Sequence, residues 1–325
     1  MTHALVTGGA GFIGSHVAEA YLARGWRVTV LDNLSTGHRA ALRWGVFVEG
    51  SLGDRTRVAE LLRAHRVDAV MHFAASSLVG ESVSDPYAYY DNNVVATLGL
   101  LQAMREAKVT QFVFSSTAAI FGEARSAQID EDHPQLPLNP YGRSKHAVEG
   151  MLTDAARAYG LNAVALRYFN AAGADPSGLI GESHTPETHL IPRLLRRAAG
   201  EALDVTIYGD DYATPDGSCI RDYIHIADLA DAHLLALDYS RAMPGFHAFN
   251  LGNGTGYSVR EVIAAVEAVI GRSLDIAVGP RRAGDPAVLV ASSARARAVL
   301  GWQPRRAELR QIVGDAWRWH RQPAY

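Results

Sequence analysis

The chain has 325 residues, of which 48% are hydrophobic and 20% charged, and its formal net charge is −3 at pH 7. These values are typical of a globular protein with one large domain or two unequal lobes, and they exclude a general attraction to nucleic acid or anionic membranes. The single cysteine, Cys219, excludes an internal disulfide, and no apolar run approaches the roughly 18 residues of a membrane span, so we expect a cytoplasmic protein.

Short β-rich segments alternate with helical patterns in the first half of the chain. The expected strands are residues 4–7, 27–31, 46–48, 69–73, 112–115 and 163–167. The expected helices between them are residues 13–24, 55–64, 86–107 and 144–159. Regular alternation of strand and helix predicts a parallel sheet with right-handed crossovers, so this half should be an α/β domain.

The pattern changes after Asn170, because the segment that follows (residues 171–188) is rich in Gly, Pro, Ser and His and predicts an irregular loop. Ser258 and Glu261 predict a capping box at the start of a helix that ends at Ile270. The other expected elements are helices at 190–200 and 228–239 and strands at 204–208 and 248–251. We expect residues 1–170 to form one lobe, with a returning segment near 220–256. Residues 171–219 and 257–325 should form a smaller α+β lobe.

A glycine-rich turn with Gly8, Gly11 and Gly14 follows the first expected strand and opens the first helix. Glycines permit a tight turn and let backbone N–H groups approach a pyrophosphate, which the positive end of the helix dipole also favours. Glycine triplets alone also occur in ordinary strand–helix turns. Asp32, at the end of the next strand, is the acid expected about 20 residues further on. The pair of signals predicts a dinucleotide site on a Rossmann-type doubly wound parallel sheet.

The same aspartate predicts which dinucleotide binds. A carboxylate at Asp32 accepts hydrogen bonds from both ribose hydroxyls and repels a 2′-phosphate, which favours NAD over NADP. Arg39 and Arg43 lie nearby in the sequence and keep NADP open as an alternative.

Tyr141 and Lys145 are four residues apart, and this spacing places both side chains on one face of a helix start. A free phenol, with a pKa of about 10, is a poor base at neutral pH, but a nearby ammonium favours the phenolate. The pair alone occurs by chance in many helices. It follows the dinucleotide turn and the strand end Ser115-Ser116-Thr117, so we predict that it is catalytic.

Together these motifs resemble the extended short-chain dehydrogenase/reductase superfamily, and within it the chain is similar to the UDP-glucose 4-epimerases over essentially its whole length. The glycine and Tyr/Lys motifs indicate only the superfamily. The segments that point to the epimerases are residues 79–82, 89–93, 166–170, 221–225 and 280–285.

The resemblance implies an isomerase mechanism. Tyr141 would remove the proton from the sugar O4 while C4 gives hydride to the nicotinamide. Thr117 would donate a second hydrogen bond to O4, and Lys145 would hold the nicotinamide ribose and lower the pKa of the phenol. The 4-keto sugar would then turn over and take hydride back on its other face, interconverting UDP-glucose and UDP-galactose. There is no net redox change, so NAD stays bound, and the UDP must anchor the turning sugar.

The resemblance also implies a set of contacts. The implied cofactor contacts are Gly8, Gly11, Phe12, Ile13, Gly14, Asp32, Asn33, Ser35, Thr36, Gly37, Ser51, Leu52, Phe73, Ala74, Ala75, Ser77, Asn92, Ser115, Tyr141, Lys145 and Phe169. The implied substrate contacts are Thr117, Tyr141, Asn170, His189, Leu190, Thr206, Tyr208, Arg221, Arg282, Asp285 and Leu289. The forked guanidinium groups of the two arginines suit the diphosphate, and Asp285 matches a residue that binds the uridine ribose.

Four positions depart from the family pattern. Ser77 stands where some members have lysine, and Ser51 where some have an aspartate that binds adenine. His189 replaces an asparagine of several relatives. Leu289 matches the position that gates an N-acetyl group at sugar C2; leucine is intermediate between tyrosine and a small residue, which predicts a preference for UDP-glucose and UDP-galactose with weak turnover of N-acetyl forms.

Other functions remain as alternatives. A 4,6-dehydratase needs an acid and a base after the threonine, but Thr117 is followed by Ala118 and Ala119. A UDP-uronic acid epimerase or decarboxylase is harder to exclude. Loss of Tyr141 or Lys145 would have favoured a non-catalytic NAD-sensing protein, but both residues are present. The thirteen histidines show no His-Glu-x-x-His spacing, so we expect no metal. The helices after Pro86 and Ser144 offer apolar faces for a homodimer, as in the family.

Overall fold

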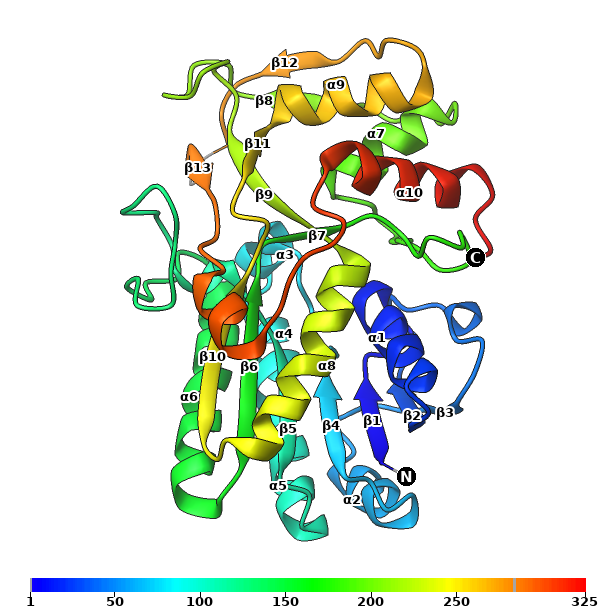
Figure 1. Cartoon of the computed structure of the whole chain (residues 1–325), viewed down its shortest axis with the longest axis vertical. Helices are drawn as coiled ribbons and strands as arrows, with labels where there is room; N and C mark the ends of the chain where they lie inside the picture. The colour runs from blue at the N-terminus through cyan, green and yellow to red at the C-terminus, as the bar shows by residue number, and fades with distance from the viewer. Residues whose placement is uncertain (1, 283–284) are drawn as a thin grey trace.

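The computed structural model describes residues 2–282 and 285–325, and a seven-stranded sheet dominates its larger lobe (Figure 1). The strand order is β10-β6-β5-β4-β1-β2-β3, and every neighbouring pair is parallel. The strands are β1 (His3–Thr7), β2 (Arg27–Asp32), β3 (Val46–Glu49), β4 (Ala69–His72), β5 (Gln111–Thr117), β6 (Asn162–Tyr168) and β10 (Phe246–Leu251). The last of these returns from the second half of the chain and completes the edge beside β6.

Helices cover both faces of this sheet. One apolar core joins the sheet to α1 (Phe12–Ala23) and α8 (Ile226–Ala242). A second core joins the opposite face to α2 (Arg55–Ala64), α5 (Ala96–Ala107) and α6 (Pro140–Tyr159). A parallel sheet buried on both faces explains the nearly continuous apolar strands of the sequence. The expected Rossmann-type α/β fold is therefore confirmed.

Two helices differ from the sequence expectation. The α6 helix begins at Pro140 rather than at 144, because Asn139 caps it by accepting a hydrogen bond from the Gly142 amide at 2.8 Å and proline suits the first helical position. The single helix expected at 86–107 is divided into α4 (Pro86–Tyr90), a π-helical turn (Asp91–Val95) and α5. A further helix, α3 (Val79–Ser84), precedes it; short 3₁₀ turns lie at Arg39–Ala41 and Ala118–Ile120, and a π-helical turn at Ala296–Leu300.

The smaller lobe contains short strands and three packed helices. Its four-stranded sheet consists of β7 (Asn170–Ala172), β9 (Ile220–His225), β11 (Gly256–Ser258) and β13 (Val288–Leu289). A second sheet pairs β8 (Thr206–Tyr208) with β12 (Ala277–Gly279). A third apolar core joins α7 (Leu190–Ala198), α9 (Val259–Ile270) and α10 (Leu309–Arg321). The capping box expected at the start of α9 is present, with the Glu261 amide donating to the Ser258 hydroxyl at 3.0 Å.

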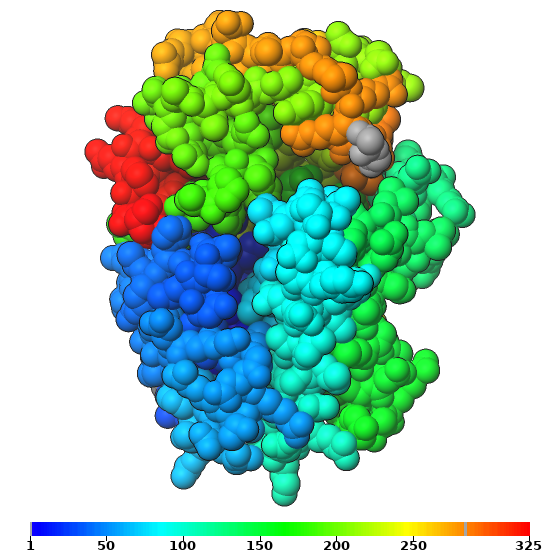
Figure 2. Space-filling model, turned by 180° about the vertical axis from the view of Figure 1, so that it is seen from behind, coloured from blue at the N-terminus to red at the C-terminus, as the bar shows by residue number. Residues whose placement is uncertain are grey.

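The carboxyl ends of the parallel strands all meet the smaller lobe (Figure 1). Ligands of open α/β sheets bind at this edge. Viewed from behind, the surface is hollowed between the N-terminal segments in blue and the following segments in cyan, beneath the green part of the second lobe (Figure 2). Among the described residues, no helix combines the length and apolar character needed to span a membrane.

Candidate active site

The glycine-rich turn after β1 is built for a close backbone approach. Gly8 has φ of +69°, and a Cβ there would meet the Ala74 backbone nitrogen at 2.4 Å. A Cβ on Gly14 would meet the Gly8 carbonyl oxygen at 2.3 Å. Gly11 caps α1 without a side-chain hydrogen bond, and the first turn of α1 contains no acidic residue. The first N–H groups of α1, at Phe12 and Ile13, therefore face an open position suited to an anion.

Asp32 lies next to this turn at the end of β2. Its Oδ2 accepts a hydrogen bond from the Ala10 amide at 2.9 Å, and its Oδ1 accepts one from the Leu34 amide at 2.8 Å. Each carboxylate oxygen keeps a second lone pair for a ribose hydroxyl. The two arginines that kept NADP open are engaged with aromatic rings: Arg39 lies 4.7 Å from the Phe47 ring centre, and Arg43 lies against Trp44.

Most of the other predicted cofactor residues lie in loops after neighbouring strands, whereas Ser115 lies within β5 and Asn92 in the π-helical turn before α5. Phe73, Ala74, Ala75 and Ser77 follow β4, while Asn33, Ser35, Thr36 and Gly37 follow β2. Ser51 accepts a hydrogen bond from the Gly53 amide at 3.1 Å, and Asn92 donates to the Ser76 hydroxyl at 3.3 Å. Leu52 differs, because its side chain is buried in the core between the sheet and α2, α5 and α6. A ligand could therefore contact mainly the backbone of this residue.

The predicted catalytic side chains meet at the end of β5. Thr117 is the last residue of β5 and hydrogen-bonds Tyr141 of α6. Lys145, one turn further along α6, is buried and donates from Nζ to the Ser115 carbonyl oxygen at 2.8 Å. Burial raises the pKa of Tyr141, and the hydrogen bond from Thr117 offsets only part of this. In the protein by itself, the tyrosine pKa therefore moves opposite to the expected depression by lysine.

Lys145 lies near a buried charge network that was not predicted from the sequence. Burial lowers the pKa of Lys145 to about 7, and the nearby Glu149 acts in the opposite direction. Glu149 forms an ion pair with Arg167 at 2.5 Å and accepts a hydrogen bond from Ser116 at 2.5 Å. An arginine inside an apolar strand requires a buried acid, so Arg167 was the available signal. The network fixes α6 against β5 and β6.

A second missed residue, Asn93, connects the loop after β4 to α6. Its Oδ1 accepts a hydrogen bond from the Ser76 amide at 2.8 Å, and its Nδ2 donates to the Ser144 hydroxyl at 3.0 Å. Nearby, the Tyr89 ring meets the Tyr141 ring edge-on, with 6.4 Å between centroids. These contacts position Tyr141 from the side opposite to β5, and the segment 89–93 carried the signal.

The second lobe brings the predicted diphosphate and uridine contacts together. Arg221 on β9 donates to the Asp285 carboxylate at 3.0 Å and to the Pro286 carbonyl oxygen at 2.9 Å. The Arg282 guanidinium lies 3.8 Å from the ring centre of Tyr208 on β8. Within the predicted segment 280–285, Ala283 and Gly284 lie outside the described residues.

Three further predicted substrate residues lie on short strands of this lobe. Leu289 pairs with Arg221 in register and packs with Phe169 around a small apolar cluster. Asn170 on β7 donates from its amide to the Asp222 carbonyl oxygen at 2.8 Å. Thr206 lies on the same short strand as Tyr208.

His189 and Leu190 lie at the start of α7, and the histidine belongs to a charged cluster. Its Nδ1 lies 2.6 Å from Oε1 of Glu182 and 3.5 Å from Oε1 of Glu187. Burial alone would lower the pKa of His189, but the two carboxylates raise it to about 10. Nδ1 of its ring is thus engaged with two acids, while 51% of the side chain is accessible, and the expected substrate contact remains a prediction.

Comparisons with known proteins agree with this geometry. Residues 4–252 match the family model described as "NAD dependent epimerase/dehydratase family". The chain is 52% identical over 318 residues to a UDP-glucose 4-epimerase of Halalkalibacterium halodurans, which covers 98% of this chain and 95% of the relative. It superposes on UDP-glucose 4-epimerase from Brucella ovis in complex with NAD with a TM-score of 0.95, at 50% identity and 98% coverage of both chains.

A third relative was solved with a sugar nucleotide. The chain is similar to UDP-glucose-4-epimerase from Stenotrophomonas maltophila with bound NAD and formylated UDP-arabinopyranose, with a TM-score of 0.95, 40% identity and coverage of 99% and 98%. The family match spans the sheet and its catalytic edge, and the full-length relatives extend it through the second lobe. The chain therefore belongs to the NAD dependent epimerase/dehydratase family.

Proposed function

We propose that this chain interconverts UDP-glucose and UDP-galactose by reversible oxidation at sugar C4, with NAD held as a resident cofactor. The observation that carries the proposal is the meeting of Tyr141, Thr117 and Lys145 at the sheet edge beside the glycine-rich turn. Full-length relatives with this activity in their names favour it over a uronic acid epimerase, a decarboxylase or an NAD sensor.

The protein supplies a proton-transfer site and a cofactor cradle. The N–H groups of the first turn of α1 suit the pyrophosphate, Asp32 suits a ribose, and Lys145 reaches the side of α6 that faces β5. Bound NAD supplies a hydride acceptor and, when oxidised, a positive charge that favours the tyrosine phenolate. Tyr141 removes the O4 proton and later returns it, while the hydroxyl of Thr117 holds O4 in place.

The absence of side-chain acids and bases directly after Thr117 argues against dehydration of the sugar. Ala118 and Ala119 form the first part of a buried 3₁₀ turn and carry only methyl groups. Elimination of water across C5 and C6 would need a proton donor and acceptor at this place. The 4-keto form of UDP-glucose has no carboxylate to lose, so reduction back to an alcohol on either face is the outcome that this site supports.

The second lobe anchors the UDP so that the sugar can turn. Arg221 and Arg282 offer forked donors that match phosphate oxygens, and Asp285 offers acceptors to the uridine ribose. The sugar position is bordered by Asn170 and Leu289, which present one amide and one apolar surface. A site with few polar groups around the ring holds neither orientation of the sugar strongly.

One incubation tests the proposal. The purified protein is mixed with UDP-galactose without added NAD, and products are identified by NMR. We expect UDP-glucose to appear until the two sugars reach equilibrium. A keto-deoxy sugar, a decarboxylated product or unchanged UDP-galactose would each contradict it.

We also propose a cytoplasmic homodimer. Apolar side chains are exposed along α4, the π-helical turn that follows it and α5: Tyr87 is 80% exposed, Val95 is 60% exposed and Leu98 is 43% exposed. Such a patch on a helix pair suits the same pair of a second copy. Light scattering should give twice the chain mass, and Val95→Lys with Leu98→Lys should give the monomer mass. A monomer before substitution contradicts the proposal.

A further inference from the structure

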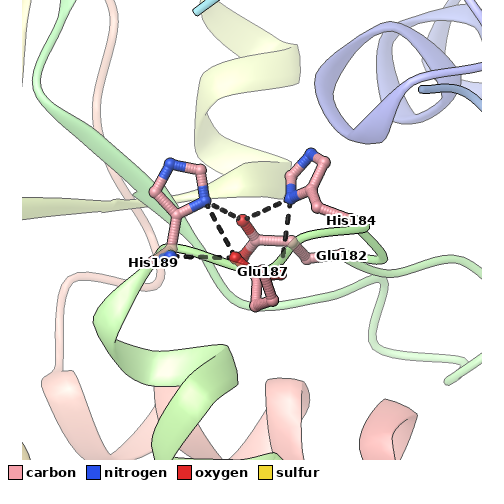
Figure 3. A group of neighbouring side chains, drawn as sticks. All are labelled: Glu182, His184, Glu187 and His189. Atoms are coloured by element: carbon pink, nitrogen blue, oxygen red, sulfur yellow. Dashed lines mark hydrogen bonds and ion pairs between the residues drawn. The ribbon is translucent and has the colours of Figure 1, made fainter. Parts of the chain in front are cut away.

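Four potential metal ligands converge in the loop between β7 and α7 (Figure 3). Glu182, His184 and Glu187 come from the loop, and His189 caps α7. Each offers one nitrogen or oxygen atom, and these four atoms lie within 4.8 Å of one another. We propose that this cluster binds a divalent transition metal of the zinc type, which joins the loop to the start of α7.

The separations between the ligand atoms fit tetrahedral zinc. With bonds of about 2.0–2.1 Å, tetrahedral ligand atoms lie about 3.4 Å apart. Nδ1 of His184 lies 3.4 Å from both Glu182 Oε1 and Glu187 Oε2. Nδ1 of His189 lies 3.5 Å from Glu187 Oε1, but only 2.6 Å from Glu182 Oε1. His189 is the most exposed of the four residues, with 51% of its side chain accessible. Its ring can therefore move away from Glu182 by the fraction of an ångström that the tetrahedral separation requires.

The central atoms lack ordinary hydrogen-bond partners. Among the described residues, Glu182 Oε1 and His184 Nδ1 are buried from solvent and find no partner with hydrogen-bond geometry, despite their close approach. The side chain of Glu182 is 4% accessible, so its carboxylate cannot turn to water. Buried polar atoms are almost always satisfied, and a shared cation would satisfy this nitrogen and this oxygen at once. Two carboxylates and two neutral imidazoles balance the double charge of the ion.

Contacts around the cluster fix its ligands in place, as expected for a metal site. Glu187 Oε1 accepts hydrogen bonds from the Thr188 and His189 amides at 2.7 and 2.8 Å. Trp319 of α10 donates from Nε1 to the Glu182 carbonyl oxygen at 3.1 Å. The His184 ring meets the Phe12 ring edge-on, with 6.5 Å between centroids, so the cluster also borders the cofactor turn.

The choice of zinc follows from the ligand types. Imidazole suits zinc, copper, iron and nickel, whereas a site for magnesium or calcium would contain oxygen ligands almost alone. Four protein ligands fill a tetrahedral shell, so the ion would be structural rather than catalytic. The competing occupant is a pair of protons, one on each histidine, which would give the cluster the same net charge.

Metal content and spectroscopy separate these occupants. The protein is purified without a histidine tag, dialysed against a chelator, loaded with Zn²⁺ or Co²⁺, and freed of excess metal by gel filtration. We expect one metal per chain by mass spectrometry, and intense visible bands of tetrahedral Co²⁺ that Zn²⁺ removes. Wild-type protein should also melt a few degrees higher after loading, because the ion binds only the folded chain.

Matched variants locate the site. Glu182→Gln combined with His184→Ala should weaken binding by at least about a hundredfold, since even supporting residues cost up to that factor. The control is His38→Ala, because His38 contacts the same loop through the Ser183 carbonyl oxygen at 3.2 Å yet offers no ligand to the cluster. It should retain one metal per chain.

Failure has a distinct signature. The proposal is overturned if the wild-type protein, after loading, contains less than a tenth of an equivalent of metal and shows no cobalt bands. Two protons would then be the occupant of the cluster. Retention of metal by the double variant overturns it as well, and circular dichroism shows that this variant is folded. UDP-galactose turnover is measured on the same samples, so loss of the epimerase proposal would appear separately from loss of the metal proposal.

Discussion

Two ion pairs near the predicted site, one in each lobe, differ in burial. In the sheet lobe, the Arg167–Glu149 pair leaves 4% of each side chain accessible, and Glu149 also accepts a hydrogen bond from Ser116 of β5. In the smaller lobe, the Arg221–Asp285 pair leaves 14% and 32% accessible. Charges buried in this way are fixed parts of a structure, whereas exposed pairs can exchange one partner for a ligand. In the proposed mechanism, the chemistry therefore lies on the lobe with the fixed pair (the rigid lobe), and the anchoring of UDP lies on the lobe with the exchangeable pair (the adaptable lobe).

Tyr141→Phe should have the largest effect, because it removes the proton carrier from the rigid lobe without touching the anchor. We expect kcat to fall by about 10³-fold or more, the upper part of the range for general acid–base catalysis. Turnover of UDP-galactose measures the loss, while bound NAD and UDP affinity should stay at wild-type values. Activity within tenfold of wild type would show that another group carries the proton.

Glu149→Gln should have the next largest effect, and it acts on stability. The substitution leaves the Arg167 charge buried without its partner, which costs about 3–5 kcal/mol. The control is Glu106→Gln, which breaks the exposed pair with Arg55 and should cost less than about 1 kcal/mol. Urea unfolding followed by circular dichroism measures both. Equal losses in the free energy of unfolding for the two variants would contradict the distinction between fixed and exchangeable ion pairs.

The sequence predicted the rigid lobe better than the adaptable one, for a physical reason. Apolar runs and glycines at fixed positions are local signals, so β1 to β6, the turn at Gly8 and the Asp32 position followed from neighbouring residues. Partners such as Arg221 and Asp285 are 64 residues apart, and only resemblance connected them. The cluster around Glu182 lies in an irregular loop without helical spacing, so no periodic pattern indicated that its four side chains meet.

Arg281 and Arg282 are adjacent in the smaller lobe, and substituting each one tests which of them anchors the UDP. Arg282→Ala should raise KM for UDP-galactose about tenfold or more with little change in kcat, because a hydrogen bond to a charged group contributes about 1.5–3 kcal/mol. Its neighbour Arg281 is paired with Asp211 and lies 4.2 Å from the Tyr212 ring centre. Arg281→Ala should therefore change KM less than about twofold. A large fall in kcat for Arg282→Ala would place this arginine in the chemistry instead.

Leu289 should give the smallest effect on the main reaction, because it borders the sugar with an apolar surface and anchors nothing. Leu289→Tyr should leave turnover of UDP-galactose within about threefold and abolish the weak turnover of the N-acetyl sugar. Leu289→Ser should raise the N-acetyl turnover several-fold, since one hydrophobic contact discriminates by roughly 1–3 kcal/mol. The ratio of kcat/KM for the two substrates, measured side by side, tests both variants. The exposed residue Leu136, substituted by serine, serves as the control and should leave this ratio unchanged. If both Leu289 variants also leave it unchanged, sugar selection lies elsewhere, and the adaptable lobe contributes anchoring alone.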